Sequence, residues 1–181
     1  MKVWGGPADK DKDNMTRSLV DELKQKRPFT LPAQEASLSV IRTAEVIRRR
    51  LGAILSPYNL TLPQYNVLRI LRGAHPQVLP TLEIVDRMLL KEAGAPGITR
   101  LLDALETKRL IQRKRIRRDR RVVVCRITEE GLRMLEELDP LDLATHNVLM
   151  SPLTQDEVQK LIELLSKIRS GTSLKDKTLL L

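Results

Sequence analysis

The residues in this sequence best suited to chemistry are a run of arginines and lysines, which could bind a polyanion. Nine basic residues and one acid lie between Lys108 and Arg121, so this segment holds +8 of the chain's net charge of +9. Charge concentrated in one place creates a local positive potential, whereas evenly spread charge mainly confers solubility. The segment therefore predicts contact with phosphates, with a solubilising loop as the alternative.

Other reactive residues are few. Cys125 is the single cysteine, so it forms neither an internal disulfide nor a cysteine zinc cluster. It lies in an apolar stretch, which favours structural packing over redox sensing. His75 and His146 are the two histidines, and no motif around them predicts a metal site. No nucleophile elbow, phosphate loop or pair of catalytic carboxylates is present, so we expect no enzyme activity, no cofactor and no metal.

The aromatic content separates two kinds of nucleic-acid binding. Proteins that bind single strands usually stack bases on aromatic side chains. This chain has four aromatic residues, which are Trp4, Phe29, Tyr58 and Tyr65. The sequence therefore favours double-stranded DNA over a single strand.

Length and composition indicate a globular domain with a short extension. The chain has 181 residues, of which 41% are hydrophobic and 30% charged, as is usual for soluble proteins. No apolar run approaches the ~18 residues of a membrane helix. The first thirty residues lack the apolar region of a secretory signal. We expect a cytoplasmic protein with no membrane contact.

The spacing of apolar residues predicts the elements that carry the basic segment. Helices are expected at about 16–26, 33–55, 61–73, 81–90, 96–108, 128–138 and 154–168. Between the fifth and sixth helices the period changes, and two short strands on either side of the polar turn 117–121 predict a hairpin. Thr61 with Gln64, and Thr154 with Glu157, have the spacing of capping boxes, and Thr128 is a third expected N-cap.

Short helices followed by a two-stranded ribbon predict a winged helix-turn-helix. The expected fold is mainly α with a small β-hairpin, with N- and C-terminal dimerisation helices around the DNA-binding domain. The expected parts are an arm at 1–30, a dimerisation helix at 33–55, the winged domain at 58–128, C-terminal dimerisation helices at 129–169 and a tail at 170–181.

The segment from Leu79 to Gly131 resembles the MarR family of bacterial transcription regulators. Ile98-Thr99-Arg100-Leu101-Leu102 is similar to the family's recognition helix. Asp119-Arg120-Arg121, followed by Thr128-Glu129-Glu130-Gly131, is similar to its wing and the helix after it. The Thr61-to-Leu71 helix and the long flanking helices also match.

Two positions depart from the family pattern. Arg109 stands where the family usually has a glycine after the recognition helix, so we expect another turn geometry there. Pro140 falls within what is often a long dimerisation helix, so we expect that helix to be kinked or split.

The resemblance implies a homodimer that reads a near-palindromic operator, as a repressor released by a small, often phenolic, effector. Tyr58 and Tyr65 are the candidate lining of an effector pocket, and core packing is the alternative for Tyr65. The rival hypothesis is an architectural or protein-interaction module that binds DNA non-specifically, because a fold alone does not establish function.

The candidate recognition helix begins at Pro96 and Gly97, where free N–H groups would favour a phosphate. Arg100 could donate two hydrogen bonds to a guanine, and Thr99 could meet a thymine methyl or a phosphate. The alternative for Arg100 is an ordinary solvated helix residue.

The candidate wing supplies shape readout and affinity. Arg121 is expected in the minor groove, where a narrow groove concentrates negative potential, and Asp119 would brace it. Arg117, Arg118 and Arg120 are expected to contact phosphates, which adds affinity without sequence information.

Overall fold

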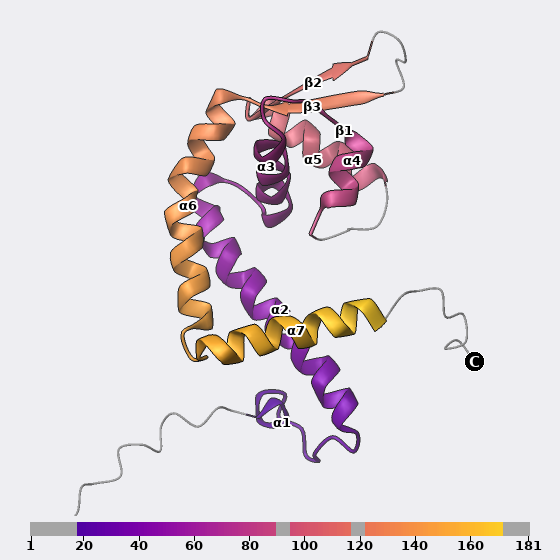
Figure 1. The fold of residues 1–181 in the computed structure, drawn as a ribbon, viewed down its shortest axis with the longest axis vertical. Helices are drawn as coiled ribbons and strands as arrows, with labels where there is room; N and C mark the ends of the chain where they lie inside the picture. Colours follow the sequence, from indigo (N-terminus) through magenta and orange to yellow (C-terminus); the bar gives the residue numbers. More distant parts are fainter. Residues whose placement is uncertain (1–17, 90–94, 117–121, 172–181) are drawn as a thin grey trace, which may run out of the picture. The chain divides into compact units, whose positions relative to one another are not determined.

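A computed structural model describes residues 18–89, 95–116 and 122–171. It is mainly helical with a small antiparallel sheet, which confirms the expected fold class (Figure 1). The helices are α1 (Leu19–Glu22), α2 (Pro32–Leu55), the 3-10 helix η2 (Ser56–Tyr58), α3 (Leu62–Ala74), α4 (Thr81–Arg87), α5 (Ala95–Thr107), α6 (Glu129–Met150) and α7 (Gln155–Gly171). The strands are β1 (Leu79–Pro80), β2 (Ile111–Arg115) and β3 (Val123–Ile127). No helix in the described ranges is long and apolar enough to span a membrane.

The chain divides into two compact units, Met1–Val46 and Ile47–Leu181. In the first unit, the Ser18 hydroxyl accepts a hydrogen bond from the backbone N–H of Asp21 and caps α1. The Arg42 guanidinium on α2 lies 3.0 Å from the Glu22 carboxylate. The helix expected at 16–26 is therefore shorter than predicted, with α1 ending at Glu22.

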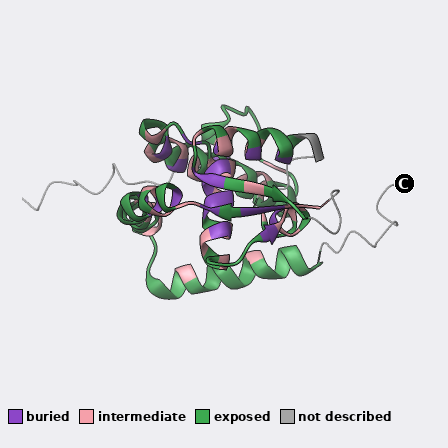
Figure 2. Ribbon diagram, turned by 90° about the horizontal axis from the view of Figure 1, so that it is seen from above, coloured by how far each residue is buried: buried purple, intermediate pink, exposed green. Residues whose placement is uncertain are grey.

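The second unit is built around one apolar core (Figure 2). Side chains from α3, α5, α6 and the sheet meet there, and the largest fully buried ones include Leu68, Leu71, Leu105, Ile111 and Leu135. Each helix contributes residues at spacings of three and four, as the periodicity predicts. This core fixes α5 and the hairpin within the same winged domain.

The sheet has the order β1-β3-β2, and both pairings are antiparallel. Ile111 pairs with Ile127 and Arg115 with Val123, so the expected hairpin is confirmed. Strand β1 adds Leu79 opposite Cys125. Strand β1 was not predicted, because two residues, one of them a proline, show no alternation of apolar and polar side chains.

The three predicted N-caps are present. Thr61 and Gln64 form a reciprocal capping box at α3. The Thr128 hydroxyl accepts from the backbone N–H of Gly131 at the start of α6. Thr154 and Glu157 form the corresponding pair of bonds at α7. These bonds satisfy backbone donors that would otherwise lack partners at a helix start.

Pro140 does not split the C-terminal helix, so of the two expected outcomes, a kink or a split, the split is wrong. Helix α6 runs from Glu129 through Pro140 to Met150. A proline removes one backbone hydrogen bond, but packing and ion pairs hold the helix on both sides of it. Leu135 and Leu138 are fully buried before Pro140, and Asp139 and Asp142 are paired with arginines of α3.

Arg109 also differs from its prediction, because it adopts the glycine-type geometry. Its φ is 60°, in the left-handed region. The N–H of Arg109 bonds to the carbonyl of Glu106, and that of Leu110 to the carbonyl of Leu105. These two bonds form a Schellman motif, and the buried Leu105 and Leu110 add its usual apolar contact. The turn is set by these bonds and this packing, although arginine replaces glycine.

Candidate nucleic-acid interface

Helix α5 presents one face to the core and another to solvent. Ile98 and Leu102 are buried, with exposed fractions of 9% and 2%. Gly97, Thr99 and Arg100 are exposed on the opposite side of the first turns. This division follows from the helical period of 3.6 residues, and it leaves the predicted recognition residues accessible.

The first turn of α5 has room for a close approach. A side chain added at Gly97 would meet no atom within 4 Å. Pro96 lies in the same turn, within the helix that begins at Ala95. The structure does not describe the Pro96 side chain, so its predicted role stays a prediction.

Arg100 is available for a ligand. It is exposed, and none of the described residues forms an ion pair or hydrogen bond with its guanidinium. Thr99 is exposed too and lines a groove of about 720 Å³ between α5 and the hairpin. Glu106 and Lys114 line the same groove. The two elements predicted to contact DNA are thus adjacent, with the groove between them.

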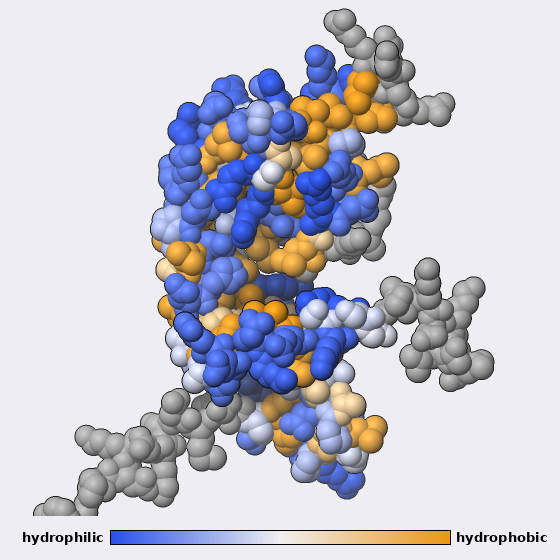
Figure 3. Space-filling view, viewed as in Figure 1, coloured by the Kyte–Doolittle hydropathy of each residue, from blue (hydrophilic) through white to orange (hydrophobic). Residues whose placement is uncertain are grey.

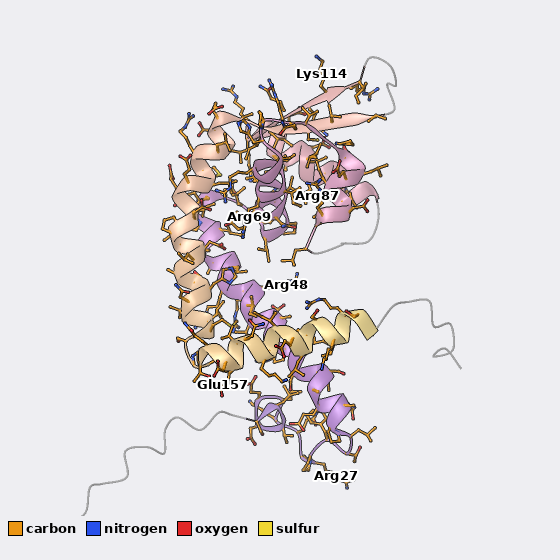
Figure 4. All side chains as sticks on the ribbon, viewed as in Figure 1. Arg27, Arg48, Arg69, Arg87, Lys114 and Glu157 are labelled. Carbon is orange, nitrogen blue, oxygen red and sulfur yellow. The ribbon has the colours of Figure 1, made fainter. Side chains whose placement is uncertain are left out.

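The described basic residues of the segment fall into two groups: some are exposed to solvent, and others bond to neighbouring parts of the winged domain. Lys114 and Arg115 on β2 are exposed, and Figure 4 shows Lys114 pointing away from the winged domain. Lys108 instead donates to the backbone carbonyl of Asn59 and to Gln64 at 3.4 Å. Arg113 turns toward α5 and pairs with its acids. Arg113 is therefore not available for a phosphate contact.

The predicted wing tip lies outside the described residues. This applies to Arg117, Arg118, Asp119, Arg120 and Arg121. The strands on either side of the tip are described, and Ile116 N–H bonds to the carbonyl of Val122 at 3.0 Å. The hairpin is therefore closed up to the residues flanking the tip, and the roles of the tip residues stay predictions.

Arg113 belongs to the basic segment 108–121 that is expected to bind a polyanion, and its actual partners were not predicted. Its side chain is 22% exposed and contacts Asp103 and Glu106 of α5. One signal could have revealed this. Arg113 is two residues after the buried Ile111, and alternate residues of a strand share a face.

The two tyrosines differ in burial. Tyr65 is 3% exposed and lies in the core, whereas Tyr58 is half-buried beside it. Burial raises the pKa of the Tyr65 hydroxyl, with Asp142 a smaller contribution. That hydroxyl has no hydrogen-bond partner among the described residues. Tyr65 thus packs in the core, its role in an effector pocket stays a prediction, and the Arg69 guanidinium lies 5.7 Å from its ring centroid.

The described surroundings of Cys125 and the two histidines give no sign of a reactive or metal-binding site. Cys125 is fully buried in β3, and burial raises the pKa of its thiol. The His146 ring nitrogen lies 3.5 Å from Asp142, whereas His75 follows the end of α3. No group of three or more metal-binding side chains occurs within the described part of the chain.

Comparison with known proteins agrees with this architecture. The family model of the transcriptional regulator SarA/Rot matches residues 50–138. The HTH-type transcriptional regulator MhqR of Bacillus subtilis is 30% identical over 127 residues, which cover 70% of this chain and 84% of MhqR.

Solved structures extend the match. A MarR transcription factor from Planctomyces limnophilus is 37% identical, with a TM-score of 0.61 over 77% of this chain and 98% of its own. A mutant MarR from Escherichia coli in complex with operator DNA is 25% identical, with a TM-score of 0.66 over 84% of this chain and 99% of its own. A winged domain with an exposed α5, together with relatives that match nearly end to end, shows that this chain belongs to the MarR family of transcription regulators.

Proposed function

We propose that the protein is a dimeric, sequence-specific DNA-binding repressor that acts in the cytoplasm on a near-palindromic operator. The observation that carries this proposal is the exposure of Arg100 on α5, together with that of Lys114 and Arg115 of the hairpin, which line the same groove as Thr99 of α5. Residues 58–128 would form the DNA-binding domain. Residues 33–55 and 129–169 would form the dimer interface, with 1–30 as an arm and 170–181 as a tail.

Helix α5 would read bases in the major groove. Arg100 can donate two hydrogen bonds to guanine O6 and N7, and Thr99 can contact a thymine methyl or a phosphate. The open space at Gly97 supports a close approach of the backbone to DNA. Pro96 would begin the turn whose N–H groups favour a phosphate.

The hairpin would hold the flanking DNA. Lys114 and Arg115 have the exposure that phosphate contacts need, and Arg117, Arg118 and Arg120 would continue them toward the tip. Arg121, braced by Asp119, would enter the minor groove. Phosphate contacts position the protein and add affinity, while the bases are read by α5.

A second copy of the chain would cover the apolar side chains left exposed on α6 and α7. Helix α7 has no buried residue, although it is amphipathic, and Figure 3 shows scattered apolar patches among the polar surface around it. The exposed apolar side chains of the two helices include Leu143, Val148, Ile162, Leu164 and Ile168. Single exposed leucines are common on protein surfaces, but many large apolar side chains left exposed on two neighbouring helices favour an interface. A dimer would place two α5 helices about one duplex turn apart, ~34 Å.

A small, phenolic molecule would release the operator. Tyr58 is the residue suited to line its pocket, because it is half-buried at the edge of the core. Tyr65 would stand behind it as the inner wall, since its side chain is 3% exposed. Effector release would act by changing the geometry of the two α5 helices rather than by blocking them.

The test is selection of genomic fragments by the purified protein, followed by footprinting of the bound fragments. The proposal expects protected sites with two half-sites about one turn apart, and release when phenolic ligands are added. The rival module would bind DNA with a specificity ratio near one. The absence of enriched fragments would contradict sequence-specific reading.

A further inference from the structure

Arg113 lies in the basic segment, yet its side chain faces helix α5. Its Nε atom lies 2.9 Å from Glu106 Oε2, and its Nη2 atom lies 2.6 Å from the same oxygen. Nη2 also lies 2.6 Å from Asp103 Oδ1. The backbone N–H of Arg113 donates to Glu106 Oε1 at 3.1 Å. Both carboxyl oxygens of Glu106 are therefore engaged by one residue of β2.

The positions of these residues in the sequence explain the arrangement. Asp103 and Glu106 are three apart on α5, so they share a face of the helix. Arg113 is two residues after the buried Ile111, so both point to the same face of the sheet. A planar guanidinium can bridge two carboxylates at fixed angles, which a lysine ammonium cannot do.

The local charge argues against a phosphate contact by Arg113. Its guanidinium is paired with two carboxylates, so the three side chains together carry a negative charge. The hydrogen bonds from Arg113 lower the pKa of Glu106, which keeps that carboxylate ionised at neutral pH. In contrast, the next residue, Lys114, is exposed and no described residue forms an ion pair with it.

The pairing joins the two elements that would contact DNA. Helix α5 carries Thr99 and Arg100, and β2 continues from Arg113 into Lys114 and Arg115. The Arg113 guanidinium bridges Glu106 and Asp103 while its backbone N–H holds the second Glu106 oxygen. Because charge-assisted bonds to several atoms fix geometry as well as distance, the link restrains how far α5 can turn relative to the hairpin. A groove separates the two elements nearby, so this link spans a place where packing alone is incomplete.

We propose that Arg113 is a positioning residue for DNA recognition, which holds α5 at the angle at which α5 and the hairpin engage the same duplex. The inference rests on the proposed function. Arg113 contributes to operator affinity through Asp103 and Glu106 and makes no phosphate contact. Loss of the link lowers binding to the operator, while the general attraction to DNA remains.

The test uses the full-length double variant Arg113→Gln/Glu106→Gln, which removes the link without changing the net charge. Lys114→Gln is the matched control on the same strand. Fluorescence anisotropy measures binding to a duplex with the selected operator and to a scrambled duplex, between about 50 and 200 mM salt. Thermal unfolding curves of all variants identify a temperature at which every variant is folded, and binding is measured at that temperature.

The double variant is expected to bind the operator about tenfold more weakly, the size of one lost base contact, with unchanged scrambled-duplex affinity and salt slope. Lys114→Gln is expected to weaken binding to both duplexes and to reduce the log–log salt slope by about 0.9. Arg113→Lys keeps the positive charge but not the planar guanidinium. It is expected to give an intermediate loss of affinity for the operator and none for the scrambled duplex.

Operator affinity within twofold of wild type in the double variant would overturn the inference. A reduced salt slope with equal losses on both duplexes would also overturn it, because Arg113 would then be a phosphate contact. Wild-type protein that ignores both duplexes would instead contradict the proposed function, and the inference would fall with it.

Discussion

Arg72 of α3 and Asp139 of α6 face each other in a two-pronged ion pair. Nη1 lies 2.7 Å from Oδ2, and Nη2 lies 2.9 Å from Oδ1. One turn along, Arg69 lies 3.4 Å from Asp142, which follows Pro140 in the helix. The winged domain is thus joined to α6 at two successive positions, which helps α6 continue through its proline.

The first prediction concerns the pH dependence of this link. Hydrogen bonds from Arg72 hold the pKa of Asp139 below its ordinary value of 3.8. A carboxylate whose pKa is lower in the folded state stabilises the fold at pH values above its unfolded-state pKa. This stabilisation is lost as the pH falls through the folded-state pKa. Asp139→Asn should therefore lower the free energy of unfolding at pH 7 by up to about 1 kcal/mol, since the pair is partly exposed.

Urea denaturation of the wild type and Asp139→Asn, repeated from pH 7 downward, measures this difference. It should be constant at neutral pH and shrink below about pH 4. Glu137→Gln is the control, because Glu137 is exposed on the same helix and has no ion-pair partner within the described residues. An equal effect of both substitutions would show that the ion pair adds no stability.

The second prediction concerns Gly131 in the first turn of α6. A Cβ atom there would lie 2.4 Å from the Leu110 carbonyl oxygen and 2.7 Å from a side-chain carbon of Ile127. Since the first contact is with backbone, it cannot be relieved by a rotamer change. Gly131→Ala should destabilise the protein by about 1–3 kcal/mol, the range for overpacking.

Gly73→Ala is the matched control for Gly131→Ala. A Cβ atom at Gly73 would meet nothing within 4 Å, and the residue lies inside α3. Alanine should therefore stabilise that helix by up to about 1 kcal/mol. Thermal or urea unfolding of both variants gives the comparison, and opposite signs are expected. A neutral Gly131→Ala would mean that α6 can move away from Leu110 without cost.

The third prediction concerns base reading by Arg100. Arg100→Ala should reduce discrimination between the operator and its best mismatch at the contacted guanine by about 1–3 kcal/mol. Binding to random DNA should change little. Competition binding with single-base operator variants measures this, and Lys26→Ala, at an exposed position outside the proposed DNA-binding domain and dimer interface, is the charge-matched control. If the variant discriminates between operator and mismatch as well as the wild type does, Arg100 is an ordinary solvent-exposed residue that reads no base.

The fourth prediction concerns Cys125. Burial keeps its thiol neutral at ordinary pH, and the thiolate is the reactive form. Labelling by an aromatic disulfide reagent should therefore be slow in the native protein and complete after denaturation. Cys125→Ala should keep its DNA affinity. Fast native labelling accompanied by loss of DNA binding would instead make Cys125 a redox sensor.

The sequence predicted those features that depend on local pattern. The stripe on α5, the hairpin and the capping residues Thr61, Thr128 and Thr154 all follow from spacing within a few residues. The predicted positions of the helix ends were less accurate. For example, α4 ends at Arg87 rather than near Leu90, and α3 runs past Gly73 to Ala74.

Features that depend on long-range contacts could not be predicted in this way. Strand β1 exists because Leu79 meets Cys125 across the sheet. Arg109 keeps a left-handed turn because Leu105 and Leu110 are buried together. Likewise, charge counting included Arg113 in the basic segment without revealing its role, because its partners on α5 become neighbours only in the folded chain.

The most direct test of the account is the salt dependence of binding to double-stranded DNA by the wild-type protein. If five basic residues of each subunit (Lys114, Arg115, Arg117, Arg118 and Arg120) meet phosphates, the slope of log K against log salt should be about −4 to −5 per subunit. Fluorescence anisotropy with a fixed duplex measures it. A slope near zero, or a protein that ignores duplex DNA at low salt, would contradict the proposal that α5 and the basic hairpin bind DNA together.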